Sequence, residues 1–330
     1  MIKKRMISAI KPSGHLTLGN YIGALANFVK YQDDFEMIVF IANLHTITVP
    51  QEPDELRSNL EEAAILYLAA GLDPAKATIF LQSDVHEHAQ LGHILQCFTY
   101  LGELNRMTQY KDKVAKGETN LGVGLYTYPT LMAADILLYD AQFVPVGIDQ
   151  KQHVELTRDL AERINNRFDK ELFVIPEPLL EEVGTKIYDL QDPSKKMSKS
   201  DVSDKGCIYL MDDPKKARKK IMSAITDSYD TIQYDPEKQP GISNLLVIAA
   251  SLKKVSVDTI LMETQGMRYG DFKKYVASIV EETLTDIQSR YQDIKAQNVL
   301  NEVLSEGALK ARSIASKKLK EVQSTIGIEL

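Results

Sequence analysis

The stretch that decides the fold is "MIVFIANLHTIT", residues 37–48, where an apolar, partly β-branched run ends at a polar turn. It is typical of a buried strand. The next stretch, "PDELRSNLEEAAILYLAAGL" (53–72), has apolar residues at helical spacing, with Pro53 in its first turn and Gly71 near its end. A second strand-like run, "ATIFLQSDV" (77–85), follows. Strand, helix and strand in this order predict a right-handed crossover between parallel strands, and therefore a doubly wound, Rossmann-like α/β domain.

Composition and charge restrict the class of protein. The chain has 330 residues, of which 44% are hydrophobic and 26% charged, and a net charge of −7. This charge argues against a general nucleic-acid coat protein, although "KKARKK" (215–220) is a local basic run. Cys97 and Cys207 lie far apart in sequence, which favours two reduced thiols. We find no signal peptide and no apolar run long enough to span a bilayer, so we expect a cytoplasmic protein without a membrane partner.

The periodicity changes along the chain. Helical patterns dominate from about 100 to 170, which indicates a helical insertion, and strand signals fade beyond about 205. The loop "DPSKKMSKSDVSDKG" (192–206) marks the boundary. We therefore predict a catalytic domain at 1–205 and a helical domain at 206–330, whose last helix packs back on the first domain.

Ligands of doubly wound sheets bind beyond the carboxyl ends of the strands. The segments to search are therefore "KPSG", "NLHTIT" and "QSDVHEH", each of which follows a predicted strand. The histidines of "HEHAQLGH" (86–93) do not have the H-E-x-x-H spacing of a zinc site, so we predict no protein-held metal. The chain also lacks the glycine-rich turns of nicotinamide dehydrogenases and P-loop enzymes.

The most informative loop is "KKMSKS", residues 195–200. Lysine ammonium groups on flexible stems can stabilise the charge that develops on a leaving pyrophosphate. Without further support, such a loop would be interpreted as a solvated surface. Its last five letters, however, match the second signature of class I aminoacyl-tRNA synthetases. The turn "PSGHLTLGNYIGAL" (12–25) resembles the first signature as found in tryptophanyl-tRNA synthetases of bacterial type, with Thr17-Leu18-Gly19-Asn20 at its four-letter core.

The resemblance covers nearly the whole chain, including segments 102–113, 127–163, 192–201 and 224–246. The combination of "YPxLMAADIL" and "VGxDQxxH" favours tryptophan over tyrosine. The resemblance implies activation of L-tryptophan by ATP, with Mg²⁺ bound to the phosphates, followed by transfer of tryptophan to tRNA(Trp). It also implies a homodimer in which the helical C-terminal domain reads the anticodon.

Carried over to matching positions, the resemblance also implies an active site. The residues expected to bind ATP are Lys11, Pro12, Ser13, Gly19, Asn20, Gly147, Ile148, Asp149, Ile187 (through its backbone), Lys196, Met197, Ser198, Lys199 and Ser200. Of these, Asn20, Lys196 and Lys199 are expected to be catalytic, together with Lys113. Asp135 is expected to accept the indole N–H, which agrees with its place in the sequence because an acid between apolar neighbours is seldom left unpaired. The other residues expected to bind tryptophan are Met132, Tyr128, His45, Gln150 and Ile7. For His45 a structural role is an equal alternative, and for His153 it is the favoured one.

Three positions depart from the common bacterial pattern. Lys11 stands where glutamine is more usual, Ile7 replaces an aromatic residue, and Leu44 replaces a polar one. His15 lies two positions before the signature, so we interpret it as a surface or hinge residue. Four functions are compared: a tryptophan–tRNA ligase, a tyrosine–tRNA ligase, a stand-alone nucleotidyltransferase and a relative that has lost catalysis. Intact signatures argue against the relative that has lost catalysis, and more than 100 helical residues after the lysine loop argue against the stand-alone nucleotidyltransferase. The tyrosine–tRNA ligase shares both signatures and remains the alternative.

Overall fold

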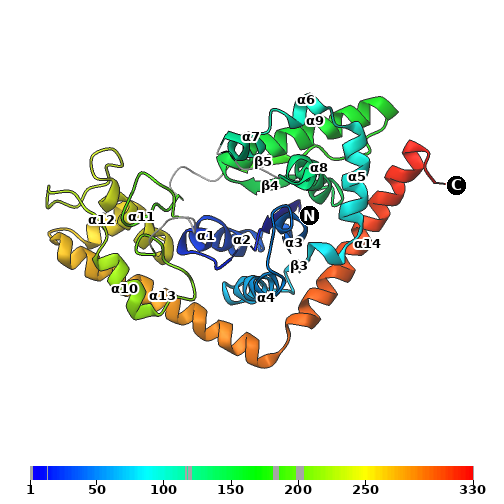
Figure 1. Ribbon diagram of the computed structural model, residues 1–330. Helices are drawn as coiled ribbons and strands as arrows, with labels where there is room; N and C mark the ends of the chain where they lie inside the picture. The colour runs from blue at the N-terminus through cyan, green and yellow to red at the C-terminus, as the bar shows by residue number, and fades with distance from the viewer. Residues whose placement is uncertain are drawn as a thin grey trace.

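The computed structural model describes residues 3–12, 14–115, 117, 121–180, 186–197 and 204–329. In Figure 1 a central sheet is flanked by helices, and a second group of helices lies beside it. Within the described residues the sheet has five parallel strands in the order β3-β2-β1-β4-β5. The strands are β1 (Arg5–Ile10), β2 (Glu36–Ile41), β3 (Ala77–Leu81), β4 (Phe143–Val146) and β5 (Glu177–Leu180). The predicted Rossmann-like α/β fold is confirmed.

Both faces of the sheet are buried, because successive side chains of a strand point to opposite faces. Along β2, Met37 and Val39 belong to one apolar cluster, whereas Ile38 and Phe40 belong to the other. A strand that is buried on both faces reads as a continuous apolar run, which is why the sequence around residue 37 was recognisable.

Helices cover the two faces. The first face carries α1 (Leu18–Asn20), the π-helix η1 (Tyr21–Leu25), α2 (Ala26–Tyr31) and α4 (Pro53–Ala69). The second face carries α5 (Glu87–Phe98), α8 (Val123–Leu137) and α9 (Lys151–Phe168). Short elements connect these layers: α3 (Asn43–Thr46), η2 (Gln82–Asp84), α6 (Leu101–Leu104), α7 (Thr108–Ala115) and η3 (Ile148–Gln150).

Some element bounds differ from the predicted ones. The helix predicted over 53–72 ends at Ala69, because Gly71 has a φ of +110° and turns the chain. The strand predicted over 77–85 ends at Leu81, where a 3₁₀ turn begins. β4 lies in a segment that was predicted to be mainly helical. This strand has only 4 residues and includes Pro145, so it carries little periodic signal.

The C-terminal part consists of α10 (Pro214–Met222), α11 (Pro240–Lys253), α12 (Val257–Glu263), α13 (Tyr269–Gln297) and α14 (Leu300–Ile326). The long α13 extends from this helical group to α4, and α14 then runs along β3 and α5 (Figure 1). The apolar cluster of the first sheet face continues without interruption into α10, α11 and α13. None of the helices in the described ranges is long and apolar enough to cross a membrane.

Candidate active site

The turn after β1 is hydrogen-bonded to the chain that follows the lysine loop, residues 195–200. The amide of Leu18 donates to the carbonyl of Ile208 at 2.8 Å, and the amide of Leu210 donates to the carbonyl of Leu16 at 2.9 Å. The signature turn and a segment about 190 residues further along the chain therefore lie side by side beyond the carboxyl end of β1.

Gly19 packs against the base of the lysine loop. A Cβ added to Gly19 would lie 3.6 Å from the Cβ of Met197 and 3.7 Å from the Cβ of Ile187. The amide of Met197 also donates to the carbonyl of Ile187 at 2.9 Å. The structure thus brings together three residues that were expected to bind ATP. The side chains of Ile187 and Met197 are buried, so contacts from these two residues to a nucleotide would come from their backbone atoms.

Asn20 closes the turn with a capping box. Its Oδ1 accepts from both the amide and the hydroxyl of Thr17 at 3.0 Å, and its own amide donates to Thr17 Oγ1 at 3.1 Å. This arrangement fixes the first turn of α1. Because the capping box uses Oδ1, Nδ2 is the atom of the Asn20 side chain that is available to donate to a ligand.

Lysines approach the same turn from separate elements. Lys11 follows β1, Lys113 lies in the last turn of α7, and the side chain of Lys196 is exposed. Partial burial and the positive charge of Lys113 together lower the pKa of Lys11, which places these two ammonium groups near each other. Among the other expected ATP residues, Pro12 is buried, Gly147 directly follows β4 and Ile148 is exposed. The predictions for Ser13, Ser198, Lys199 and Ser200, and for the side chain of Asp149, lie outside the described residues.

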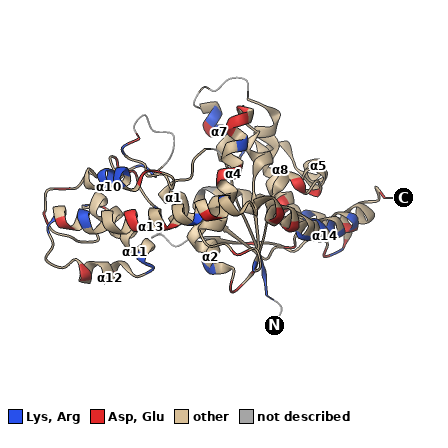
Figure 2. Ribbon diagram, turned by 90° about the horizontal axis from the view of Figure 1, so that it is seen from below, with Lys and Arg blue, Asp and Glu red and all other residues tan. Residues whose placement is uncertain are grey.

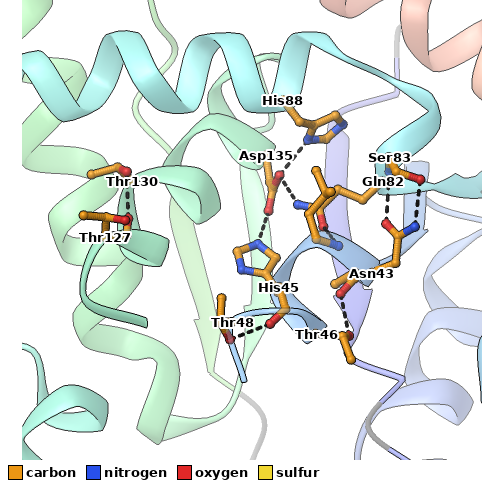
Figure 3. Close-up of polar contacts among 12 residues, drawn as sticks. Asn43, His45, Thr46, Thr48, Gln82, Ser83, His88, Thr127, Thr130 and Asp135 are labelled. Carbon is orange, nitrogen blue, oxygen red and sulfur yellow. Dashed lines mark hydrogen bonds and ion pairs between the residues drawn. The ribbon is translucent and has the colours of Figure 1, made fainter. Parts of the chain in front are cut away.

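Asp135, on α8, lies at the centre of a buried polar network (Figure 3). Its Oδ1 accepts from Gln82 Nε2 at 2.7 Å and from His88 Nδ1 at 2.6 Å. Its Oδ2 accepts from His45 Nε2 at 2.7 Å. The donors come from the segments after β2 and β3 and from α5, so the carboxylate is held from several directions.

Asp135 is ionised although it is only 3% exposed. Burial by itself raises the pKa of a carboxyl group, but the contacts with His45 and then His88 outweigh burial and lower the pKa of Asp135 to about 2. A charged acceptor is therefore present inside an apolar setting. Among the described residues, no cluster of histidine, cysteine and carboxylate side chains has the geometry of a metal centre.

Of the other residues expected to bind tryptophan, His45 contacts Asp135 and Tyr128 contacts His45. The hydroxyl of Tyr128 makes a hydrogen bond with His153 Nε2, and the Tyr128 ring meets the His45 ring edge-on with 5.9 Å between centroids. Met132 and Gln150 are half-buried, on α8 and at the end of η3 respectively. Ile7, on β1, is buried in the same apolar cluster as α8. His45 was expected at the charged ends of the amino acid, and its Nε2 lies 2.7 Å from Asp135 Oδ2.

The sequence did not lead us to three residues of this network. Gln82 and His88 contact Asp135 directly, and Tyr139 contacts His88, with 2.7 Å between its hydroxyl and His88 Nε2. A signal was present, because "QSDVHEH" follows a strand and was one of the segments to search. Its histidines were weighed only as metal ligands, and the sequence does not show that α8 passes above them.

His15 lies outside this network. Its Nδ1 is 2.9 Å from both carboxylate oxygens of Glu62 on α4, and its ring meets that of Tyr209 edge-on. The side chain of His15 is 63% exposed. These contacts connect the turn to α4 at the surface.

Residues 3–285 match the family described as tRNA synthetases class I (W and Y). Among curated relatives, the tryptophan–tRNA ligase of Caldanaerobacter subterraneus subsp. tengcongensis is 51% identical over 327 residues, which cover 99% of each chain. The tryptophan–tRNA ligase of Bacillus subtilis is 49% identical over 99% of this chain and 98% of its own.

Solved structures show the same likeness. Tryptophanyl-tRNA synthetase from Mycoplasma pneumoniae superposes with a TM-score of 0.90 at 39% identity, covering 99% of this chain and 98% of that one. The Campylobacter jejuni enzyme, solved in complex with ADP and tryptophan, gives a TM-score of 0.82 at 37% identity, over 98% of this chain and 99% of that one.

Proposed function

The chain belongs to the class I tRNA synthetases of the tryptophan and tyrosine type, and we infer that it is a tryptophan–tRNA ligase. The observation that carries this inference is the likeness, over nearly the full length, to ligases that are named for tryptophan. The buried, ionised carboxylate of Asp135 agrees with it, because a charged acceptor suits the single N–H of an indole ring.

The reaction has two steps. The carboxylate of L-tryptophan attacks the α-phosphate of ATP, which forms tryptophanyl-adenylate and releases pyrophosphate. A hydroxyl of the terminal ribose of the tRNA then attacks the acyl group, and AMP leaves. Neither step requires a nucleophile from the protein, so positioning and charge stabilisation suffice.

At the end of the site that binds the ATP phosphates, the protein contributes lysine ammonium groups and the side-chain amide of Asn20. Lys11, Lys113 and Lys196 stabilise the charge on the phosphates, and Asn20 donates from Nδ2 to a phosphate oxygen. ATP binding agrees with the ADP complex of the Campylobacter relative. Ammonium groups are not metal ligands, so Mg²⁺ would be held by the phosphate oxygens, where it would supply further positive charge.

At the amino-acid end, Asp135 accepts the indole N–H and Met132 packs on the ring. Tyr128 and Gln150 bind the ammonium and carboxylate groups. If Tyr128 accepts from the ammonium group, its own proton points to His153 Nε2, which is the atom it contacts. This gives His153 an orienting role in place of the structural one favoured by the sequence.

Further parts of the proposal concern the partners. The helical part beyond residue 205 binds the anticodon arm of tRNA(Trp), and the protein acts as a cytoplasmic homodimer. Large apolar side chains that remain exposed around α6 and the start of α8 support the dimer. These are Ile47, Tyr100, Leu101 and Val123.

The decisive test is ATP–pyrophosphate exchange with a panel of amino acids. We expect exchange that depends on tryptophan and is at least tenfold weaker with tyrosine, as the loss of one well-placed hydrogen bond would give. Exchange with tyrosine alone would make the protein a tyrosine–tRNA ligase. Exchange with no amino acid would leave the nucleotidyltransferase or the inactive relative. Charging of a tRNA(Trp) transcript then tests the second step.

A further inference from the structure

The two oxygens of the Asp135 carboxylate have different surroundings. Oδ1 accepts two hydrogen bonds, from Gln82 and His88, whereas Oδ2 accepts one, from His45. Each carboxylate oxygen has two in-plane lone pairs. Oδ1 is therefore saturated by the protein, and Oδ2 keeps one lone pair for another donor. The His45 side chain is 13% exposed and that of His88 is 0% exposed, so Oδ2 is also the oxygen nearer to the open side.

The proton positions on His88 follow from its two partners. Asp135 is ionised and can only accept, so His88 Nδ1 carries a proton and donates to it. Burial, reinforced by the charge of Asp135, raises the pKa of Tyr139, so its hydroxyl keeps its proton. That hydroxyl is buried, and His88 Nε2 at 2.7 Å is its hydrogen-bond partner within the described residues. Tyr139 therefore donates to Nε2, and His88 donates to Asp135 from Nδ1.

This chain of contacts fixes the carboxylate. The hydroxyl of Tyr139 selects the tautomer of His88, and that tautomer supplies the donor that holds Oδ1. Packing supports the same arrangement, because the His88 ring lies 5.5 Å from the rings of both Phe40 and Tyr139, centroid to centroid. A rigid ring that donates to Oδ1 prevents the carboxylate from rotating about its Cβ–Cγ bond and turning Oδ2 away from the pocket.

We propose that His88, oriented by Tyr139, is a positioning residue for tryptophan: it holds Oδ1 of Asp135 so that Oδ2 accepts the indole N–H. The proposal rests on the proposed function, in which Asp135 binds the indole ring. It adds that the selectivity of the pocket depends on a histidine that does not touch the substrate.

The experiment compares two substrates that differ at one atom. L-β-(benzothiophen-3-yl)alanine has sulfur in place of the indole N–H and cannot donate to Asp135. KM and kcat in ATP–pyrophosphate exchange are measured for tryptophan and for this analogue. The variants are His88→Leu, which removes the donor, His88→Asn, whose amide nitrogen corresponds to Nδ1, and Tyr139→Phe. The matched control is His93→Asn, an exposed histidine on the same helix.

In His88→Leu we expect KM for tryptophan to rise at least about tenfold, the effect of misplacing one buried charged acceptor, with little change in kcat. KM for the analogue should change less than about threefold, because it makes no hydrogen bond with Asp135. His88→Asn should recover most of the loss. Tyr139→Phe should shift the ratio of the two KM values in the same direction by a smaller factor, and His93→Asn should leave it unchanged.

Equal changes in KM for both substrates in His88→Leu would mean that His88 only supports the fold, and would overturn the proposal. Unchanged KM values would overturn it as well. If His88→Leu does not fold, as judged by circular dichroism, His88→Asn and Tyr139→Phe decide the matter: a ratio that stays at the wild-type value in Tyr139→Phe contradicts the proposal.

Asp135→Asn separates this proposal from the proposed function. If wild-type protein shows no exchange with tryptophan, or if Asp135→Asn keeps the wild-type preference for tryptophan over the analogue, the assigned function of the pocket is wrong. If Asp135→Asn loses that preference while His88→Leu keeps it, Asp135 binds the indole and only the role of His88 is wrong.

Discussion

At the scale of single residues, the two polar atoms of the Asn20 side chain have different roles in the signature turn. Asn20 uses Oδ1 for the capping box and has Nδ2 available for a phosphate. We expect Asn20→Asp to keep the cap and the melting temperature but to lose at least tenfold in exchange rate, because it replaces a donor with a negative charge beside ATP. His15→Ala should keep near-normal exchange. Full activity in Asn20→Asp would refute the assignment.

In the same turn, Lys11 stands where glutamine is more usual. Its ammonium lies close enough to Lys113 for the second charge to lower its pKa, so a polyanion between the two groups would relieve their repulsion. We expect Lys11→Gln to raise the Mg²⁺ concentration needed for half-maximal exchange by a few-fold, because added Mg²⁺ replaces the lost charge. Lys11→Arg, which keeps the charge, is the control. Superimposable Mg²⁺ titrations of wild type and Lys11→Gln would disprove the role.

The carboxyl group of Asp135 makes folding stability depend on pH in a defined window. Its pKa falls from an ordinary 3.8 to about 2 on folding, so its stabilisation is present above pH 4 and is lost as the pH falls toward 2. In urea unfolding, the difference in the free energy of unfolding between wild type and Asp135→Asn should narrow by about 1 kcal/mol from pH 5 to pH 3. A difference that stays constant over this range would show that the carboxyl group is not ionised by its partners.

The sequence predicted that Asp135 is functional but did not predict its hydrogen-bond partners, and the reason is geometric. Asp135 stood out because an acid between apolar neighbours needs a partner. Its partners did not stand out, since Gln82 and His88 lie 53 and 47 positions away and meet it only after α5 and α8 pack together. A local pattern shows that a charge is buried, but only the fold shows what satisfies it.

At the scale of elements, the C-terminal helix α14 covers the edge of the sheet that β3 forms. β3 is one of the two edge strands, and α14 approaches it so closely that a Cβ on Gly307 would lie 1.8 Å from the carbonyl oxygen of Ile79. We expect Gly307→Ala to lower the free energy of unfolding by about 2 kcal/mol or more, because backbone on both sides leaves nothing flexible to move. Gly270→Ala in α13, where nothing lies within 4 Å, is the control and should be neutral or slightly stabilising.

Hydrogen-exchange measurements on the Gly307→Ala variant would locate the effect. Amides of α14 should lose protection first, while those of β1 and β2 stay protected. If Gly307→Ala unfolds at the same denaturant concentration as wild type, the close approach of α14 to the edge of β3 is not a feature of the protein in solution.

The basic helix α10 shows how an element refines a sequence prediction (Figure 2). Arg218 pairs with Glu281, and Lys220 pairs with Asp212, so these two cations stabilise the fold. The exposed cations of the run are Lys215, Lys216 and Lys219. Changing these three to glutamine should weaken tRNA binding and reduce its salt slope by roughly 2 if all three contact phosphates. Lys220→Gln should instead lower stability. An unaltered salt slope in the triple variant would assign α10 to ordinary surface.

At the scale of the whole molecule, the sequence predicted the class of fold better than its assembly. Strand and helix periodicities sufficed for the parallel sheet, because buried strands and amphipathic helices have local signatures. The last helix was expected to pack back on the first domain, but no local signature showed that α14 would lie along β3 or that α13 would reach α4. An amphipathic pattern indicates that one side of a helix is covered, but not which surface covers it. Likewise, the sequence does not indicate which exposed apolar side chains a second subunit would cover.

Several large apolar side chains near α6 are exposed. The hydroxyl of Tyr126 on α8 donates to the carbonyl of Leu101 at 3.1 Å, and a Cβ added to Gly124 would lie 3.9 Å from Thr48 Cγ2, so α6, the start of α8 and the chain after α3 are neighbours. Leu101 is 72% exposed. Isolated exposed apolar residues are common, but a contiguous group indicates an interface.

We expect wild-type protein to sediment as a dimer and Leu101→Asp to sediment as a monomer with reduced exchange, because a charge at the centre of an apolar contact has no water and no partner. Met262→Asp is the control, since Met262 is 69% exposed on α12, in the helical group away from α6 (Figure 1). It should remain dimeric and active. A Leu101→Asp protein that stays dimeric would place the interface elsewhere. A monomer with full exchange would show that each active site is complete within one chain, so that dimerisation would serve the binding of tRNA.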